Sequence, residues 1–112
     1  MNKLESEIQK EILDWLRAAG YKAWKNYLGP LLIGGGVRAR NPNAGQPDIY
    51  GIFKNRPGKM FAIEIKSYLG KLSEEQRREI LDLENSGVFV IAARSLSVVK
   101  SLLEREDVSN AS

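Results

Sequence analysis

The alternation of apolar and polar positions is clearest in the middle of the chain. Residues 49–53 and 60–66 alternate with a period of two, and the turn-forming residues 55–58, Asn-Arg-Pro-Gly, lie between them, so a β-hairpin is predicted. A simple register about this turn places Asp48 opposite Glu64, and both share a face with Lys66. The opposite face is apolar and contains Ile49, Phe53, Phe61, Ile63 and Ile65. Two carboxylates and an ammonium group therefore converge on strands that are otherwise patterned for burial.

Helical periodicity marks both ends of the chain. Apolar residues recur at helical spacing over residues 4–19 before Gly20, and residues 21–27 predict a short strand. A second helix is predicted from an N-cap at Ser73 to about residue 86, and a third from residue 95 to 106, followed by a frayed tail over 107–112. The apolar run 88–92 between these helices predicts a buried strand.

These elements give the order αβββαβα over one domain, residues 1–112. The helix between the strands at 60–66 and 88–92 is a crossover connection, so these two strands should be parallel neighbours. We therefore expect an α/β fold with a mixed central sheet flanked by helices.

A long basic connection precedes Asp48. Residues 29–45 are rich in glycine, proline and asparagine and contain Arg38 and Arg40, and Lys25 lies just before them. Such a connection is typical of a binding loop, and these three cations are candidates to contact phosphates; the alternatives are a solvated basic surface and a flexible hairpin tip. The three glycines at 34–36 do not match a P-loop or a dinucleotide fingerprint, so no nucleotide cofactor is expected.

The composition restricts the chemistry. The chain has 112 residues, no histidine and no cysteine, so thiolate and imidazole ligands, disulfides and an imidazole base are excluded. Any metal must sit on oxygen ligands, which favours Mg²⁺ or Mn²⁺. There is no apolar run of the ~20 residues that a membrane span needs and no signal peptide, so a cytoplasmic protein without membrane contact is expected.

Asp48, Glu64 and Lys66 suit metal-dependent phosphodiester hydrolysis. A divalent metal held by Asp48, Glu64 and the backbone carbonyl of Ile65 could activate a water and neutralise the charge that develops on phosphorus. Lys66 could position or deprotonate that water, or stabilise the transition-state charge.

Two further residues have both a catalytic and a structural interpretation. Gln76 could orient Lys66 or a phosphate, or it could only complete a capping box with Ser73. Glu5 lies within the apolar stripe of the first helix, where it could hold metal-bound water or a second ion. Its alternatives are a frayed terminus or a favourable interaction with the helix dipole.

The motifs resemble those of the PD-(D/E)XK nucleases, and more narrowly the virus-type replication–repair nuclease (VRR-NUC) domain of phage and bacteria. The resemblance rests on Gly45-x-Pro47-Asp48, Glu64-Ile65-Lys66 and Gly70-Lys71-Leu72-Ser73-x-x-Gln76, with Glu5-x-x-Ile8-Gln9 on the first helix. It implies a restriction-endonuclease-like core and a Mg²⁺- or Mn²⁺-dependent endonuclease of a bacterial host cell that acts in DNA repair.

The same resemblance implies action on branched DNA by a homodimer similar to Holliday-junction resolvases. It maps Asp48, Glu64, Lys66 and Gln76 onto the family motifs, whereas Glu5 and Glu7 both remain open as the first-helix acid. Lys71, in the same motif, is a further predicted DNA-binding residue.

Alternative functions are a restriction-type or general nuclease on linear duplex and a catalytically silent DNA-binding module. The apolar residues Leu28, Leu31, Leu32 and Ile33, or Val98 and Val99, are candidate dimer surfaces, unless the first group folds back over the first helix.

Overall fold

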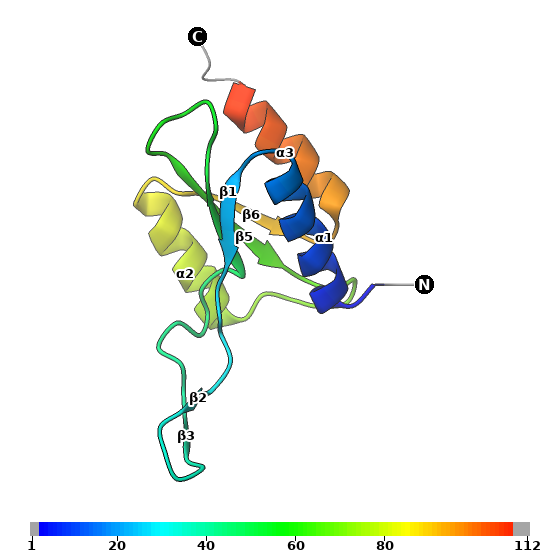
Figure 1. The fold of residues 1–112 in the computed structure, drawn as a ribbon. Helices are drawn as coiled ribbons and strands as arrows, with labels where there is room; N and C mark the ends of the chain where they lie inside the picture. The colour runs from blue at the N-terminus through cyan, green and yellow to red at the C-terminus, as the bar shows by residue number, and fades with distance from the viewer. Residues whose placement is uncertain (1–2, 109–112) are drawn as a thin grey trace.

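The computed structural model describes residues 3–108, which form nine elements (Figure 1). In chain order they are α1 Glu5–Ala18, β1 Lys22–Lys25, β2 Leu31–Leu32, β3 Arg38–Ala39, β4 Ile49–Ile52, β5 Met60–Ile65, α2 Glu74–Asn85, β6 Phe89–Ala93 and α3 Leu96–Val108. None of the helices within this described part is long and apolar enough to cross a membrane. The predicted αβββαβα order is confirmed; β2 and β3 were not predicted as strands, but they form the hairpin that was one interpretation of the glycines 34–36.

The central sheet has the strand order β1-β4-β5-β6. β1 and β5 pair antiparallel with β4, whereas β5 and β6 are parallel, so the predicted mixed sheet is confirmed. Ile49 pairs with Ile63, which is the register expected from the turn and which leaves Asp48 opposite Glu64 at the end of the ladder.

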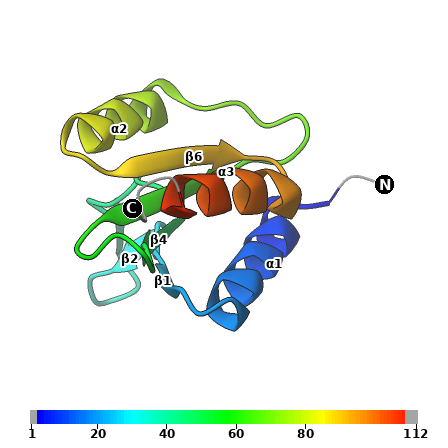
Figure 2. The same cartoon turned by 90° about the horizontal axis from the view of Figure 1, so that it is seen from above.

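Helices cover both faces of this sheet. Figure 2 shows α2 on one side of β6 and both α1 and α3 on the other. The core lies on the α1/α3 side, because Ile8, Ile12 and Leu16 of α1 and Val99 and Leu103 of α3 pack with the apolar face of the sheet. The predicted core face of β4 and β5 is confirmed, since each of its apolar residues is buried.

Gly51 allows the centre of the sheet to pack closely. A Cβ at this position would lie 2.1 Å from the ring of Phe61, which is fully buried between β4 and the helices. Phe61 in turn makes edge contacts with the rings of Tyr21 and Phe53. The absence of a side chain at residue 51 therefore lets an aromatic cluster fill the core behind the strands that carry the two acids.

Residues 28–40, which we call the arm, project from the end of the sheet as a separate hairpin (Figure 1). Leu31 and Leu32 pair antiparallel with Ala39 and Arg38. The arm points away from α1, so its apolar residues do not fold back over the first helix. They stay on the surface, with Leu32 74% exposed.

The prediction of a frayed tail from residue 107 is wrong for residues 107 and 108. Helix α3 continues to Val108, and the side chain of Asp107 is only 2% exposed. Its Oδ1 accepts a hydrogen bond from the backbone N–H of Asn55 at 3.0 Å, and its Oδ2 accepts one from the Tyr21 hydroxyl at 3.2 Å. Two donors from distant parts of the chain thus hold the last turn in place. Residues 109–112 lie outside the described part.

Candidate active site

The backbone on both sides of Asp48 is fixed by strand β1. The N–H of Asn26 donates to the carbonyl of Asp48 at 2.8 Å, and its side-chain amide donates to the carbonyl of Pro47 at 2.7 Å. These bonds extend the β1–β4 ladder by one step and aim the Asp48 side chain across the sheet. There its Oδ2 accepts a hydrogen bond from the N–H of Ile65 at 2.7 Å.

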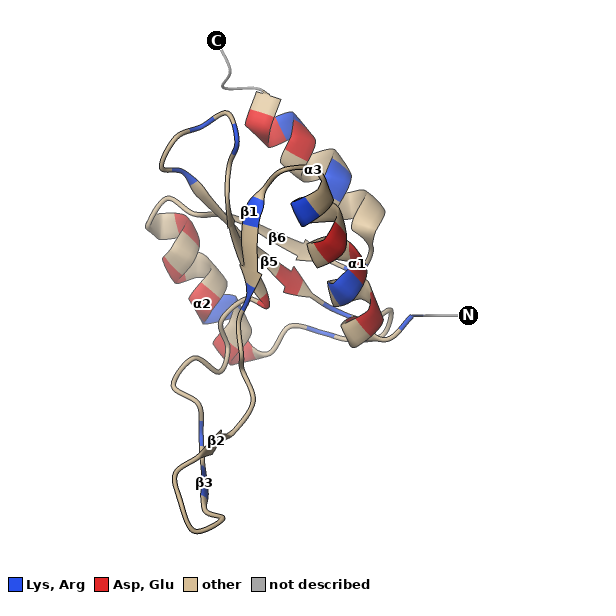
Figure 3. Cartoon of the chain, viewed as in Figure 1, with Lys and Arg blue, Asp and Glu red and all other residues tan. Residues whose placement is uncertain are grey.

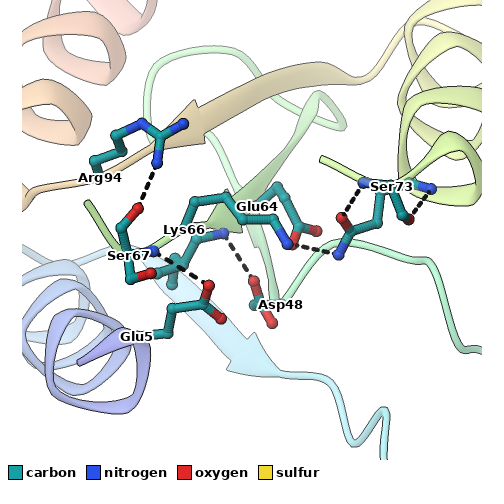
Figure 4. A network of polar contacts seen from close by, with 9 residues as sticks. Glu5, Asp48, Glu64, Lys66, Ser67, Ser73 and Arg94 are labelled. Atoms are coloured by element: carbon teal, nitrogen blue, oxygen red, sulfur yellow. Dashed lines mark hydrogen bonds and ion pairs between the residues drawn. The ribbon is translucent and has the colours of Figure 1, made fainter. Parts of the chain in front are cut away.

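Glu64 is almost completely buried beside Asp48, with a residue exposure of 2%. Its Oε1 accepts a hydrogen bond from the Gln76 side chain at 3.1 Å, and the Lys66 ammonium lies 3.9 Å from the same oxygen. Its Oε2 is buried and has no hydrogen-bond partner. Figure 4 shows Glu5, Asp48, Glu64 and Lys66 gathered around the end of β5. A buried, unpartnered carboxylate oxygen is costly unless a cation or donor satisfies it.

The protonation of both acids reflects this crowding. Burial, followed by the nearby charge of Asp48, raises the pKa of Glu64 to about 8, although the Lys66 ammonium opposes the shift. Burial also raises the pKa of Asp48, while the hydrogen bond from Ile65 works in the other direction. Two carboxylates that resist ionising side by side are the arrangement that a divalent cation would stabilise.

Gln76 has both of the roles that the sequence suggested as alternatives. Its N–H donates to the Ser73 hydroxyl at 3.0 Å and its Oε1 accepts from the N–H of Ser73 at 2.8 Å, which completes the capping box of α2. The remaining amide nitrogen reaches Glu64. The same side chain therefore starts helix α2 and connects that helix to the buried acid.

The structure distinguishes the two acids of the first helix. The Oε1 of Glu7 accepts from the backbone N–H of Leu4 at 3.2 Å and so caps α1. The Oε1 of Glu5 instead accepts from the N–H of Ser67 at 3.2 Å, in the loop that follows Lys66. Glu5 is close enough for its charge to raise the pKa of both Asp48 and Glu64. Glu5 is exposed, unlike the buried position that its place in the apolar stripe predicted, but it is the acid of the first helix whose carboxylate reaches the loop beside Lys66.

The predicted DNA-binding cations do not form one cluster. Lys25 is exposed at the end of β1, Arg38 is exposed on the arm, and Lys71 is exposed in the loop before α2. Arg40 forms an ion pair with Glu75 in the first turn of α2. They are thus spread over β1, the arm and the loop before α2, and their contact with DNA stays a prediction.

Two residues at the site were not identified from the sequence. Arg94 follows β6 directly, and its guanidinium donates to the carbonyls of Ser67 and Tyr68, so it holds the loop next to Lys66. The sequence did contain a signal for this position of Arg94: parallel pairing of β5 and β6 places residue 94 next to residue 66. Asn26 is the second such residue, since its side-chain amide donates to the carbonyl of Pro47 and its N–H to that of Asp48.

The side chains at this site could supply some of the oxygen ligands of a Mg²⁺ or Mn²⁺ ion. Among the described residues, no group of three or more Asp, Glu, His or Cys side chains is arranged to hold a metal, so the protein side chains offer the pair Asp48 and Glu64. Mg²⁺ is often bound by one or two carboxylates, with water and substrate phosphate completing its shell. The unpartnered Oε2 of Glu64 is the atom that such an ion would satisfy.

This geometry can be compared with known proteins. The model of the VRR-NUC domain family matches residues 2–96. The chain belongs to the VRR-NUC domain family. A solved structure described as a VRR_NUC domain is 25% identical, covers 89% of this chain and 94% of its own length, and superposes with a TM-score of 0.63. No curated protein matches the chain. The VRR-NUC domain thus has a restriction-endonuclease-like α/β core, and its family supports assignment as a nuclease that binds DNA.

Proposed function

We propose that this VRR-NUC domain is a Mg²⁺- or Mn²⁺-dependent endonuclease that hydrolyses phosphodiester bonds in branched DNA, in the manner of a Holliday-junction resolvase. The observation that supports the metal-dependent chemistry is the pair of crowded carboxyl groups of Asp48 and Glu64: burial raises the pKa of both, and the buried Oε2 of Glu64 accepts no hydrogen bond from an N–H group. A protein that used this fold only to bind DNA would gain nothing from such a destabilising arrangement.

The roles of the residues follow from their positions. Asp48, Glu64 and the carbonyl of Ile65 would hold the ion, which would supply Lewis-acid stabilisation of the phosphoryl oxygens and a more acidic water. The Lys66 side chain is 14% exposed and its ammonium lies 3.9 Å from Oε1 of Glu64, so it would orient the attacking water or offset negative charge on the phosphate. Gln76 keeps the Glu64 carboxylate turned toward Asp48, and Glu5 restrains the loop after Lys66.

A cleavage assay tests this proposal directly. Four-way junction, flap, single-stranded and linear duplex DNA of matched sequence are incubated with Mg²⁺, Mn²⁺ or chelator. We expect metal-dependent nicks near the branch and slow cutting of linear duplex. Equal rates on all substrates would replace the branched-DNA proposal with a general nuclease. No cleavage of any DNA, together with normal DNA binding, would favour a catalytically silent module.

We also propose that the active form is a homodimer. One chain has one acidic site and cuts one strand, whereas symmetric resolution of a four-way junction needs two nicks related by a two-fold axis. Exposed apolar residues are present on the arm and at Val98 on α3, while Val99 is fully buried in the core and is no longer a candidate. Light scattering over a concentration series tests the assembly, and a strictly monomeric protein would contradict the resolvase geometry and favour a flap-type nickase.

A further inference from the structure

The tip of the arm exposes apolar side chains that the rest of the molecule does not cover. Leu32 is 74% exposed, Ile33 63% and Val37 55%, and none of them belongs to the hydrophobic core. The tip is also narrow. Its three successive glycines, 34–36, have positive φ angles of 108°, 56° and 77°, and two backbone hydrogen bonds between residues 33–34 and Val37 close the turn. The result is a slim loop with aliphatic side chains on both of its sides.

The stem of the arm, behind this tip, carries Arg38 and Arg40, and Lys25 lies at the end of β1 where the arm begins. From residue 15 to residue 47 the chain contains no aspartate or glutamate. Figure 3 shows basic and no acidic positions along the arm. The charge around the apolar tip is therefore complementary to a polyanion and unfavourable for a partner that is itself basic.

The base of the arm is bonded to the domain on both sides, close to Asp48. The side-chain amide of Asn41, which is 5% exposed, donates to the carbonyls of Tyr27 at 2.9 Å and Gly29 at 3.1 Å. Arg40 is tied to Glu75 at the start of α2. On the other side, Asn26 is bonded to the backbone of Asp48. The direction in which the arm projects is thus set relative to the catalytic acids.

We propose that the arm is a branch-sensing wedge: its stem follows the phosphates, and Leu32 and Ile33 insert between bases where a DNA branch has already weakened stacking. This proposal rests on the proposed nuclease function and deepens it. Leucine and isoleucine are among the residues that architectural proteins insert between base steps, at a cost of a few kcal/mol of unstacking per step. That cost is lowest at a branch, so insertion would favour branched over continuous duplex DNA.

DNA fits the tip better than a second copy of the chain. A stable protein interface buries about 800 Å² on each partner. The tip offers only the side chains of Leu31, Leu32, Ile33 and Val37, and the adjoining stem would bring two sets of arginines together. The same features suit a polyanion with apolar base faces, because the cations contact phosphates while the aliphatic groups contact bases.

The test measures base unstacking without requiring cleavage. Four-way junction and flap DNA carry 2-aminopurine at the branch, and the full-length protein is added in chelator. We expect wild-type protein to increase the fluorescence. The double variant Leu32→Ser/Ile33→Ser should show no such increase in fluorescence. Its ratio of affinities for branched over linear DNA should fall roughly tenfold, while its affinity for linear DNA stays unchanged.

Two variants separate the tip from other effects. Val108→Ser is the matched control, because Val108 is 66% exposed but lies at the far end of α3 (Figure 1), and it should behave as wild type. Arg38→Ser should weaken binding to all DNA equally and reduce the salt slope by about one unit, while the fluorescence increase persists at saturating protein.

Each outcome decides the proposal. A double variant that keeps the fluorescence increase and the branch preference would overturn it. A double variant that instead changes from dimer to monomer in light scattering, with the branch preference retained, would assign the tip to a second copy. If the double variant does not unfold cooperatively, the single variants Leu32→Ser and Ile33→Ser repeat the test. A wild-type protein that unstacks the branch but cuts nothing with Mn²⁺ would refute the nuclease and keep the wedge.

Discussion

Replacing Glu64 by glutamine should stabilise the metal-free protein, although it should abolish cleavage. Glu64 is 2% exposed, its Oε2 has no partner, and its pKa is raised to about 8 from a usual value of 4.5. The pKa of Glu64 is higher in the folded state than in the unfolded state, so protonated Glu64 contributes its full share of the unfolding free energy below pH 4.5. It is lost as the pH rises toward 8, where ionisation of the buried group opposes folding. Glutamine cannot ionise, so the variant should not show this loss.

The size of the effect can be bounded. At about 1.4 kcal/mol per pKa unit the whole shift corresponds to at most ~5 kcal/mol of unfolding free energy. Asp48 shares the repulsion, and Lys66 and solvent at the edge of the site screen it, so we reduce this to roughly 1–2 kcal/mol at pH 8. For a domain of this size that is about 5–10 °C in melting temperature.

Thermal unfolding of wild type and Glu64→Gln in chelator, measured from pH 5 to pH 8.5, provides the assay. The two curves should agree near pH 5 and diverge as the pH rises. Mn²⁺ should raise the melting temperature of wild type and leave that of the variant nearly unchanged. Glu84→Gln, on the exposed surface of α2, is the control, since it removes the same charge away from the site. Parallel wild-type and Glu64→Gln curves over the whole pH range would refute the reasoning.

Four other substitutions have distinct expected results. Lys66→Ala should remove cleavage but keep Mn²⁺ affinity in calorimetry, because lysine is not a ligand; a lost affinity would contradict its assigned role. Gln76→Ala should lower both the unfolding free energy, by about 0.5–2 kcal/mol, and the single-turnover rate, since the residue both caps α2 and binds Glu64; a loss of only one would contradict the double role. Arg94→Ala removes the bonds to the loop after Lys66, so hydrogen exchange of the amides in that loop should become faster. The single-turnover rate at saturating DNA should fall roughly tenfold or more, and unchanged exchange would exclude a positioning role. Burial, followed by the charge of Asp107, raises the pKa of Tyr21 to about 12, so the wild-type protein should become less stable as the pH rises from 10 to about 12. Tyr21→Phe should not show this decrease, and alkaline unfolding that is the same in both proteins would contradict the reasoning.

The elements that the sequence predicted best are those whose local signals agree with the tertiary structure. The hairpin register that brings Asp48 to Glu64 followed from the turn position and the alternation of side chains, and the pairing of Ile49 with Ile63 confirms it. The buried face of α1, with Ile8, Ile12 and Leu16, followed from helical periodicity, although Glu5 at the end of that stripe is exposed. In both elements the repeat of side chains along the backbone determines which side of the element a residue occupies.

The features that could not be predicted depend on partners distant in sequence. Asp107 looked like part of a polar tail, but its partner Tyr21 is 86 residues away. β2 and β3 are only two residues long and project from the domain, so no core imposes an alternating pattern on them. The role of Arg94 depends on where its long side chain turns after the strand ends, which strand pairing does not determine.

The arm is inserted between two paired strands of the central sheet, and this determines how the domain can be altered. The arm leaves the sheet after β1 and returns just before β4, and those two strands are closed on each other by the bonds of Asn26 to Pro47 and Asp48. The ends of the excursion are therefore fixed by the sheet and not by the length of what lies between them. Because the entropy of closing a loop grows only logarithmically with its length, each doubling costs only about 0.6 kcal/mol. Arms of other lengths and sequences can therefore be placed between β1 and β4 at little cost in folding free energy, and under the proposed function such exchanges would change which DNA is bound without moving Asp48 or Glu64.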